Sequence, residues 1–168
     1  MSENSEFTLI DKDSDDMPEL FFTIGSNDFM VSLEDTKLSV GDKGERNGNE
    51  DIYWFKNGMY YEKYYDPGEY VSGMEWMFYD QQDNPLADFS WRDNVTEYGE
   101  RITQEQYTEE YNFSYSEGFK YVYHVMNGEI PLEEFEEMVN QFKADYCGEE
   151  ATFYDVNEDS LQQNMRWE

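Results

Sequence analysis

The sequence predicts an α+β protein, in which an antiparallel β-meander sheet packs against one main amphipathic helix (about residues 131–145), with one or two short helices. Short β-prone runs separated by turn residues fill most of the chain, and one run near its end has helical periodicity. The 168 residues also include 12 Phe, 15 Tyr and 4 Trp. Because each buried ring removes about 150–250 Å² from water, we expect an aromatic core.

The first 16 residues are acidic and hold few large apolar side chains. They are expected to form a flexible arm or a loosely attached first strand, followed by a single α+β domain over residues 17–168. The runs ELFFTI and DFMVSL flank the turn residues GSN and predict a hairpin. Residues 41–51 are rich in glycine and asparagine, which is typical of an exposed loop.

A second hairpin has the clearest local pattern. Residues 52–56 and 59–63 are β-prone and are separated by Asn57-Gly58, a dipeptide that accepts the positive φ angles of a two-residue type I′ turn. Turn sequences at residues 66–68 and 83–85 then lead into two further strands. Consecutive strands joined by short turns predict an antiparallel meander.

The last third of the chain mixes helices and strands. Thr103 and Gln106 fit a capping box and predict a short helix near residues 104–111. Residues 119–126 and 151–156 read as strands. Pro131 suits the first turn of the main helix. Apolar residues recur there at helical spacing, which defines the buried face: Leu132, Phe135, Met138, Val139 and Phe142.

The acidic composition excludes several classes of protein. Forty acidic and 11 basic side chains give a net charge of −29, so no basic face for nucleic acid or an anionic membrane is expected. No apolar run approaches the roughly 20 residues that span a bilayer, and the first residues do not resemble a signal peptide. The expected location is the cytoplasm, or the host cell cytoplasm if the protein is phage-encoded.

The residues typical of catalytic and metal sites are scarce. One cysteine, Cys147, and one histidine, His124, exclude multi-cysteine and His-rich metal sites. His124 is expected to be a packed or surface residue of a strand, and Cys147 a small apolar residue. Asp11, Asp13 and Asp15 have the spacing of the first ligands of a calcium loop, but the glycine and the final glutamate of that loop are missing. We therefore expect no metal, no cofactor and no enzymatic activity.

The remaining signal is the charge itself. Carboxylates on one face of a helix stand about 5–6 Å apart, and those on one face of a strand about 6.6 Å apart, which is near the step between phosphates of one DNA strand. A folded protein with this spacing can occupy the groove of a nucleic-acid-binding protein. The acidic face expected to contact the partner contains Glu133, Glu134, Glu136, Glu137, Glu105, Glu109, Glu110, Asp66, Glu69, Glu75 and Asp80.

The resulting hypothesis is an inhibitor that imitates nucleic acid and blocks the groove of a basic nuclease or DNA-binding protein, as anti-restriction, anti-CRISPR and nuclease-immunity proteins do. Two alternatives remain open. A carbohydrate-binding or carbohydrate-cleaving domain could use Trp54, Trp76 and Trp91 as its platform. An acidic adaptor protein would use its charge for solubility alone. The sequence leaves the oligomeric state open.

Overall fold

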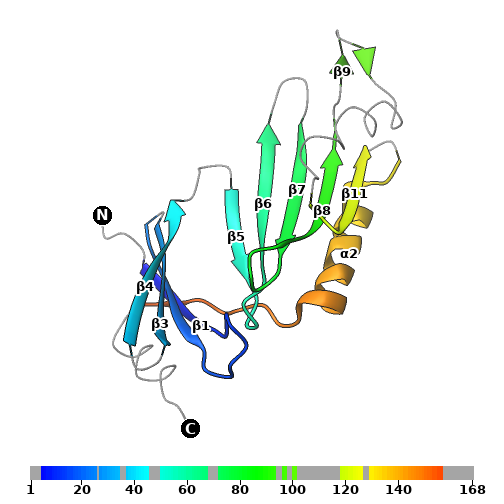
Figure 1. The fold of residues 1–168 in the computed structure, drawn as a ribbon. Coiled ribbons are helices and arrows are strands. Elements are labelled where there is room, and N and C mark those ends of the chain that lie inside the picture. Colours follow the sequence, from blue (N-terminus) through cyan, green and yellow to red (C-terminus); the bar gives the residue numbers. More distant parts are fainter. Residues whose placement is uncertain are drawn as a thin grey trace.

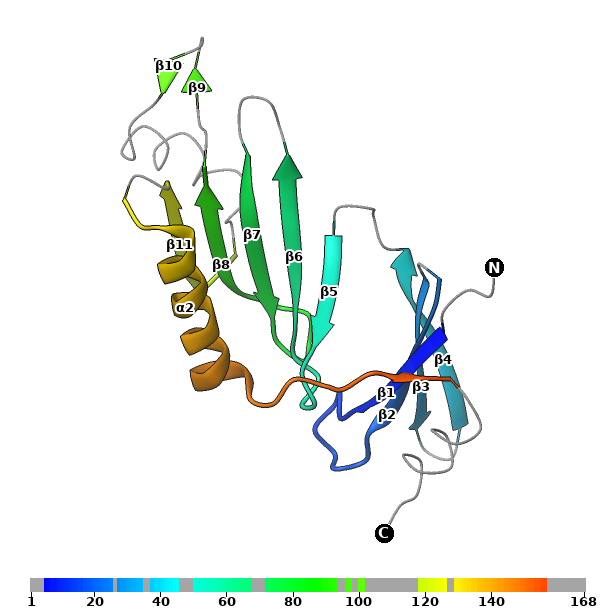
Figure 2. The same ribbon diagram turned by 180° about the vertical axis from the view of Figure 1, so that it is seen from behind.

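The computed structural model describes residues 5–25, 27–34, 37–45, 50–67, 72–93, 96–97, 100–101, 118–126 and 129–156. Two five-stranded sheets lie side by side (Figure 1). The N-terminal sheet has the order β12-β1-β2-β3-β4, and the helix-backed sheet has the order β11-β8-β7-β6-β5. The main helix, α2, covers one face of the helix-backed sheet (Figure 2). The predicted α+β class and aromatic core are confirmed.

The N-terminal sheet consists of β1 (Ser5–Ile10), β2 (Glu19–Ile24), β3 (Asn27–Glu34), β4 (Lys37–Glu45) and β12 (Tyr154–Asp155). The helix-backed sheet consists of β5 (Glu50–Trp54), β6 (Tyr60–Pro67), β7 (Ser72–Tyr79), β8 (Pro85–Arg92) and β11 (Tyr121–Met126). A two-stranded ribbon is formed by β9 (Thr96–Glu97) and β10 (Glu100–Arg101). The helical segments are α2 (Leu132–Phe142) and a π-helical turn, η1 (Lys143–Cys147).

The N-terminal sheet begins within the acidic first segment. Strand β1 pairs with β2 and β12, and its Phe7 and Ile10 are buried. The predicted hairpin of β2 and β3 is confirmed. The loop prediction for residues 41–51 is wrong at both ends, since residues 41–45 lie in β4 and residues 50–51 in β5. An edge strand such as β4 is held by backbone hydrogen bonds and accepts polar side chains, so its composition resembled that of a loop.

The helix-backed sheet contains the predicted meander, because β5, β6, β7 and β8 pair antiparallel in chain order. Strand β11 then pairs parallel to β8, from Tyr121 opposite Ala87 to Met126 opposite Arg92. A parallel pair needs a crossover connection of about a dozen residues or more. Residues 93–120 provide that length, so this sheet is mixed and not purely antiparallel.

The turn between β5 and β6 differs from the predicted type I′ turn. The Gly58 N–H donates to the Phe55 carbonyl oxygen over 3.1 Å, and the Phe55 N–H donates to Met59 over 2.9 Å. Gly58 has a φ of 84°, whereas Asn57 does not have a positive φ. This is a three-residue loop with a type I turn followed by a left-handed glycine. Asn57 instead uses its side chain, which accepts from the Met59 N–H and donates to the Cys147 carbonyl oxygen.

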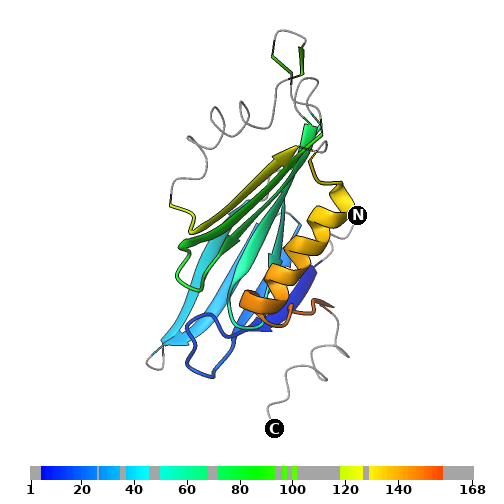
Figure 3. The same ribbon diagram turned by 90° about the vertical axis from the view of Figure 1, so that its right-hand side faces the viewer.

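Helix α2 and η1 together match the predicted main helix. Pro131 precedes α2 in an extended conformation with a ψ of 150°, which places it one residue before the first turn. Phe135, Val139 and Phe142 are buried against the sheet, and Leu132 and Met138 pack at the edge of the same cluster. Figure 3 shows α2 running along one face of the sheet. The predicted helix near residues 104–111 lies outside the described residues, and the predicted strand at 151–156 shortens to β12.

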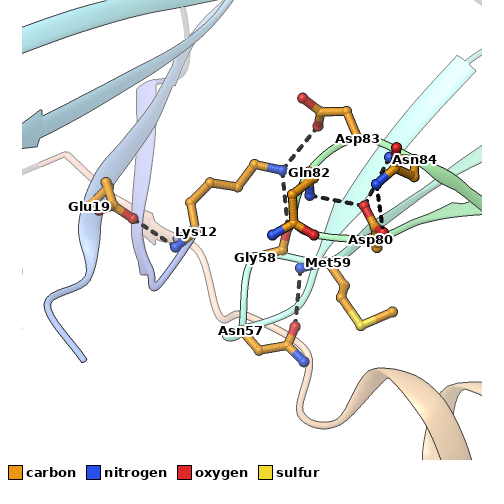
Figure 4. Close-up of polar contacts among 9 residues, drawn as sticks. All are labelled: Lys12, Glu19, Asn57, Gly58, Met59, Asp80, Gln82, Asp83 and Asn84. Carbon is orange, nitrogen blue, oxygen red and sulfur yellow. Dashed lines mark hydrogen bonds and ion pairs between the residues drawn. The ribbon is translucent and has the colours of Figure 1, made fainter. Parts of the chain in front are cut away.

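The two sheets meet at Lys12, in the loop after β1 (Figure 4). Its Nζ donates to Asp83 Oδ1 over 3.0 Å and to the Gly58 carbonyl oxygen over 3.4 Å. Its backbone N–H donates to Glu19 Oε2 over 2.7 Å. Beside this contact, the rings of Phe21 and Trp54 pack with centroids 4.9 Å apart. The junction is therefore held by both polar and aromatic contacts.

The chain after η1 returns across both sheets. Lys56 donates its N–H to the Glu149 carbonyl oxygen over 2.9 Å, and Ala151 donates to Trp54 over 2.8 Å. The chain then forms β12 beside β1. In the part of the chain that the structure describes, no helix is long and apolar enough to cross a membrane.

Candidate functional site

The outer face of α2 presents a row of exposed acidic side chains. Because Phe135, Val139 and Phe142 are buried against the sheet, the opposite side of the helix faces solvent. Glu133, Glu134 and Glu137 are exposed there, and Glu129 is exposed just before the helix. Residues three or four apart on a helix have side chains about 5–6 Å apart, so the three carboxylates on α2 form one stripe, which we call the glutamate face: Glu133, Glu134 and Glu137.

No described lysine or arginine forms an ion pair with the glutamate face. The nearest cation along the helix, Lys143, donates instead to the Tyr61 hydroxyl over 2.8 Å and pairs with Glu150 over 3.2 Å. Glu133 and Glu134 lie in the first turn of α2, where the helix dipole favours negative charge. Within the described residues, α2 thus holds this acidic stripe without a lysine or arginine to neutralise it.

Only part of the sequence-predicted acidic face comes together on α2. Glu136 is half-buried and turns toward the sheet. Asp66 lies near the end of β6 and not on α2. Four further positions lie outside the described residues: Glu69, Glu105, Glu109 and Glu110.

Asp80, also predicted to contact a partner, is engaged in the turn between β7 and β8. Its Oδ1 accepts from the backbone N–H groups of Gln82 and Asn84, and its Oδ2 accepts from the Asn84 amide (Figure 4). Burial acts to raise the pKa of Asp80, but these hydrogen bonds outweigh it and lower the pKa below its usual value. Asp80 therefore supports the turn and lies apart from the glutamate face.

Glu75 lies on the sheet face opposite α2, in a buried charged cluster. His124 Nε2 lies 2.8 Å from Asp88 Oδ2, and Arg92 Nη2 lies 3.5 Å from Glu75 Oε2. The side chains of Asp88 and His124 are 0% and 4% exposed. Burial, and next the charge of Asp88, raise the pKa of Glu75 to about 7, while Arg92 acts in the opposite direction. Glu75 is thus removed from any outer acidic surface.

This cluster also accounts for the single histidine. Of the two positions expected for this strand residue, packed or on the surface, the structure has the packed one, because the His124 ring is buried against Asp88. One ligand atom from each of Glu75, Asp88 and His124 lies within 4.8 Å of the others. Arg92 already supplies positive charge beside these carboxylates, so the arrangement is that of a buried charge network.

The acidic loop after β1 brings Asp11, Asp13 and Asp15 together. Their oxygens accept hydrogen bonds from backbone N–H groups of the same loop: Asp11 and Asp13 from Asp15, and Asp15 from Met17. Side chains that bond the backbone two to four residues on are typical of turns. The spacing that resembled a calcium loop is explained by this local turn.

A pocket of about 330 Å³ lies between α2 and strands β5 to β7. Strand register brings the residues of its floor together, because Tyr53 pairs with Tyr61 and Lys63 pairs with Trp76 on the helix-facing side. Helical spacing places Glu136, Asn140 and Lys143 on one side of the helical segment, where they form the wall. The lining residues are Tyr53, Tyr61, Lys63, Trp76, Glu136, Val139, Asn140 and Lys143.

The sequence did not reveal this pocket. The alternation of residues 61 and 63 and the helical spacing of residues 136, 140 and 143 were both readable, but which strands the helix would cover was not. The tryptophan platform suggested for carbohydrate is absent from the surface. Trp54, Trp76 and Trp91 are only 4%, 3% and 9% exposed, and of these Trp76 alone borders the pocket.

No protein-family model, no curated protein and no solved structure matches this chain. The fold and the site therefore define its class by themselves: an α+β protein with two five-stranded β-sheets, an aromatic core and an acidic helix face.

Proposed function

We propose that this protein inhibits a basic nucleic-acid-binding protein, most simply a nuclease, by placing its glutamate face where nucleic acid would bind. The observation that carries the proposal is the stripe of Glu133, Glu134 and Glu137 on α2, with which no described lysine or arginine forms an ion pair. The activity would be of the anti-restriction, anti-CRISPR or nuclease-immunity type and would take place in the cytoplasm.

Electrostatics explains how such a surface competes with DNA. B-DNA carries one negative charge per about 1.7 Å of its axis, and its protein partners hold complementary lysines and arginines. A chain with a net charge of −29 is steered toward such a partner at a raised association rate. A helix also fixes the backbone positions of its glutamates, so the conformational freedom lost on binding is mainly that of their side chains.

Exposed tyrosines in η1 and on the edge strand β11 add apolar contact area. Tyr146 is 52% exposed and stacks on Phe142 with ring centroids 4.7 Å apart. Tyr123 on β11 is 42% exposed and stacks on Phe89 at 4.9 Å. Tyrosine is enriched in interface hot spots, where desolvated rings slow dissociation. The proposed interface therefore combines carboxylates, which raise the association rate, with tyrosines, which slow dissociation.

The test uses the full chain and a variant that keeps its fold. Glu133→Gln, Glu134→Gln and Glu137→Gln together remove three charges from the glutamate face while preserving side-chain size. The matched control removes three exposed charges from the N-terminal sheet and its first loop, with Glu6→Gln, Asp13→Asn and Asp16→Asn. Both variants have the same net charge, so only the position of the lost charge differs.

The immobilised chain is first used to capture basic proteins from the lysate of its natural host, with elution by rising salt and then by duplex DNA. A captured nuclease is purified, and its DNA cleavage is measured with the native chain and both variants. The proposal requires strong inhibition by the native chain and the control, and weak inhibition by the α2 variant. Equal inhibition by all three would remove α2 from the interface. If no DNA-displaceable protein is captured, the acidic adaptor becomes the better account of the charge.

A further inference from the structure

We propose that the pocket between α2 and strands β5 to β7 binds a neutral saccharide of one or two sugar rings. This binding site is separate from the glutamate face and does not depend on the inhibition proposed above. The volume of about 330 Å³ lies near the lower end of the range for small-molecule sites, about 300–1,000 Å³. The pocket is therefore large enough for a saccharide of one or two rings.

The floor of the pocket provides an aromatic surface. Tyr53 and Tyr61 stack with ring centroids 4.8 Å apart and an interplanar angle of 11°. Tyr61 is 4% exposed, whereas Tyr53 is 38% exposed at the edge strand β5. The face of an aromatic ring is electronegative and attracts the C–H groups of a sugar ring. Tyr53 is therefore the group on which a sugar would stack.

The wall of the pocket provides hydrogen-bond donors and acceptors together. Lys63 and Lys143 offer ammonium donors, Glu136 offers a carboxylate acceptor, and the Asn140 amide offers both a donor and an acceptor. A hydroxyl group donates one hydrogen bond and can accept two. Vicinal hydroxyls therefore match a wall of this mixed kind, whereas an anionic ligand would be matched by donors alone.

The charges of the pocket favour a neutral ligand. Lys143 pairs with Glu150 at 3.2 Å, and Glu136 adds a negative charge to balance Lys63. The surrounding chain has a net charge of −29, which repels free anions. Cations are disfavoured too, because Lys143 and Lys63 already lie 4.3 Å and 5.5 Å from the ring centres of Tyr61 and Trp76. A neutral polyhydroxyl compound is neither repelled by the negative net charge nor in competition with the two lysines for the aromatic rings.

The first test measures binding directly with the full chain. Glucose, galactose, mannose, N-acetylglucosamine, maltose and cellobiose are titrated separately, with glucuronate as the anionic counterpart of glucose. Binding is followed by ligand-observed saturation-transfer NMR and by tryptophan fluorescence, since Trp76 borders the pocket. Saturable binding of at least one neutral sugar, with weaker or no binding of glucuronate, is expected. Absence of saturable binding for every neutral sugar would overturn the proposal, as would a preference for glucuronate over glucose.

The second test places the bound sugar. Tyr53→Ala and Asn140→Ala each change an exposed residue of the pocket, and each is expected to weaken binding about tenfold, the equivalent of one lost contact of about 1.4 kcal/mol. The matched control is Gln141→Ala, the next exposed residue on α2, which does not line the pocket. Unchanged affinity in both pocket variants would assign the sugar to another site and overturn the proposal. Thermal melts show that the variants are folded.

The two proposals can fail separately. The variant with Glu133→Gln, Glu134→Gln and Glu137→Gln should bind the sugar as the native chain does, because none of these residues lines the pocket. Loss of sugar binding in that variant would contradict the assignment to this pocket, whatever its effect on a nuclease.

Discussion

Gly58 and Lys12 are in backbone contact where the turn of the β5–β6 hairpin meets the loop after β1. A Cβ placed on Gly58 would lie 2.6 Å from the Lys12 Cα and 2.8 Å from the Asp11 carbonyl oxygen. Both neighbours are backbone atoms, which cannot move aside as a flexible side chain can. The contact fixes the approach of the two sheets, and it requires glycine for its size as well as for its φ of +84°.

Gly58→Ala should therefore destabilise the protein by about 2–5 kcal/mol, since a left-handed conformation costs a non-glycine residue about 1–2 kcal/mol and overpacking costs about 1–3 kcal/mol. Urea denaturation followed by fluorescence measures this loss. Gly118→Ala is the matched control, because Gly118 has a φ of +96° but its nearest neighbour would lie 3.8 Å away. A loss no larger than that of the control would mean that the close approach to Lys12 does not constrain the fold.

The same region shows how far the sequence could predict the structure. Asn57 and Gly58 correctly marked a hairpin, because few residues accept a tight reversal between two β-prone runs. The type of turn depended on contacts distant in sequence. Asn57 holds the Cys147 carbonyl oxygen at the end of η1, and Gly58 lies against Lys12. Local propensity carries no information on either contact.

The acidic site was predictable in part for a similar reason. Helical spacing alone separated the buried Phe135 from the exposed Glu133 and Glu137, as the structure has them. Strand alternation placed Glu75 on one face of β7 but did not tell which face is buried, and the side chain lies beside Asp88 and Arg92. The pocket was not predictable, because it needs the pairing of α2 with particular strands.

Cys147 provides a chemical probe of the end of the helical segment. Its side chain is fully buried, and burial raises the pKa of the thiol to about 12. Since the thiolate is the reactive form, the folded protein should not react with a disulfide reagent at mildly alkaline pH. After unfolding in guanidinium chloride, one thiol per chain should react. Rapid reaction of the folded chain would show that η1 opens readily.

Phe135 is the central contact between α2 and the sheet. It is 0% exposed, and its ring lies 5.9 Å from that of Trp76 and 6.0 Å from that of Phe89. Phe135→Ala should destabilise the fold by about 3–5 kcal/mol through lost burial and the cavity left behind. Glu134→Gln on the exposed face should change stability by less than about 0.5 kcal/mol. Equal effects of the two substitutions in urea denaturation would contradict the docking of α2.

The titration of Glu75 predicts how stability depends on pH. Burial and the neighbouring Asp88 raise the pKa of Glu75 from 4.5 to about 7. The folded chain therefore keeps this proton to a higher pH than the unfolded chain does. The stabilisation of the folded chain by the proton on Glu75 is complete below pH 4.5 and is lost as the pH rises to about 7.

Glu75→Gln removes this titration, so the stability of the variant relative to the native chain should increase between pH 4.5 and 7 and then level off. Urea midpoints measured across that range test the prediction. Repulsion within a chain of net charge −29 also weakens the native state as carboxyls ionise, so a control with the same change of charge is needed. Glu134→Gln provides it at an exposed site and should follow the native curve closely. Parallel curves for the native chain and Glu75→Gln would mean that Glu75 titrates as an ordinary solvent-exposed carboxyl.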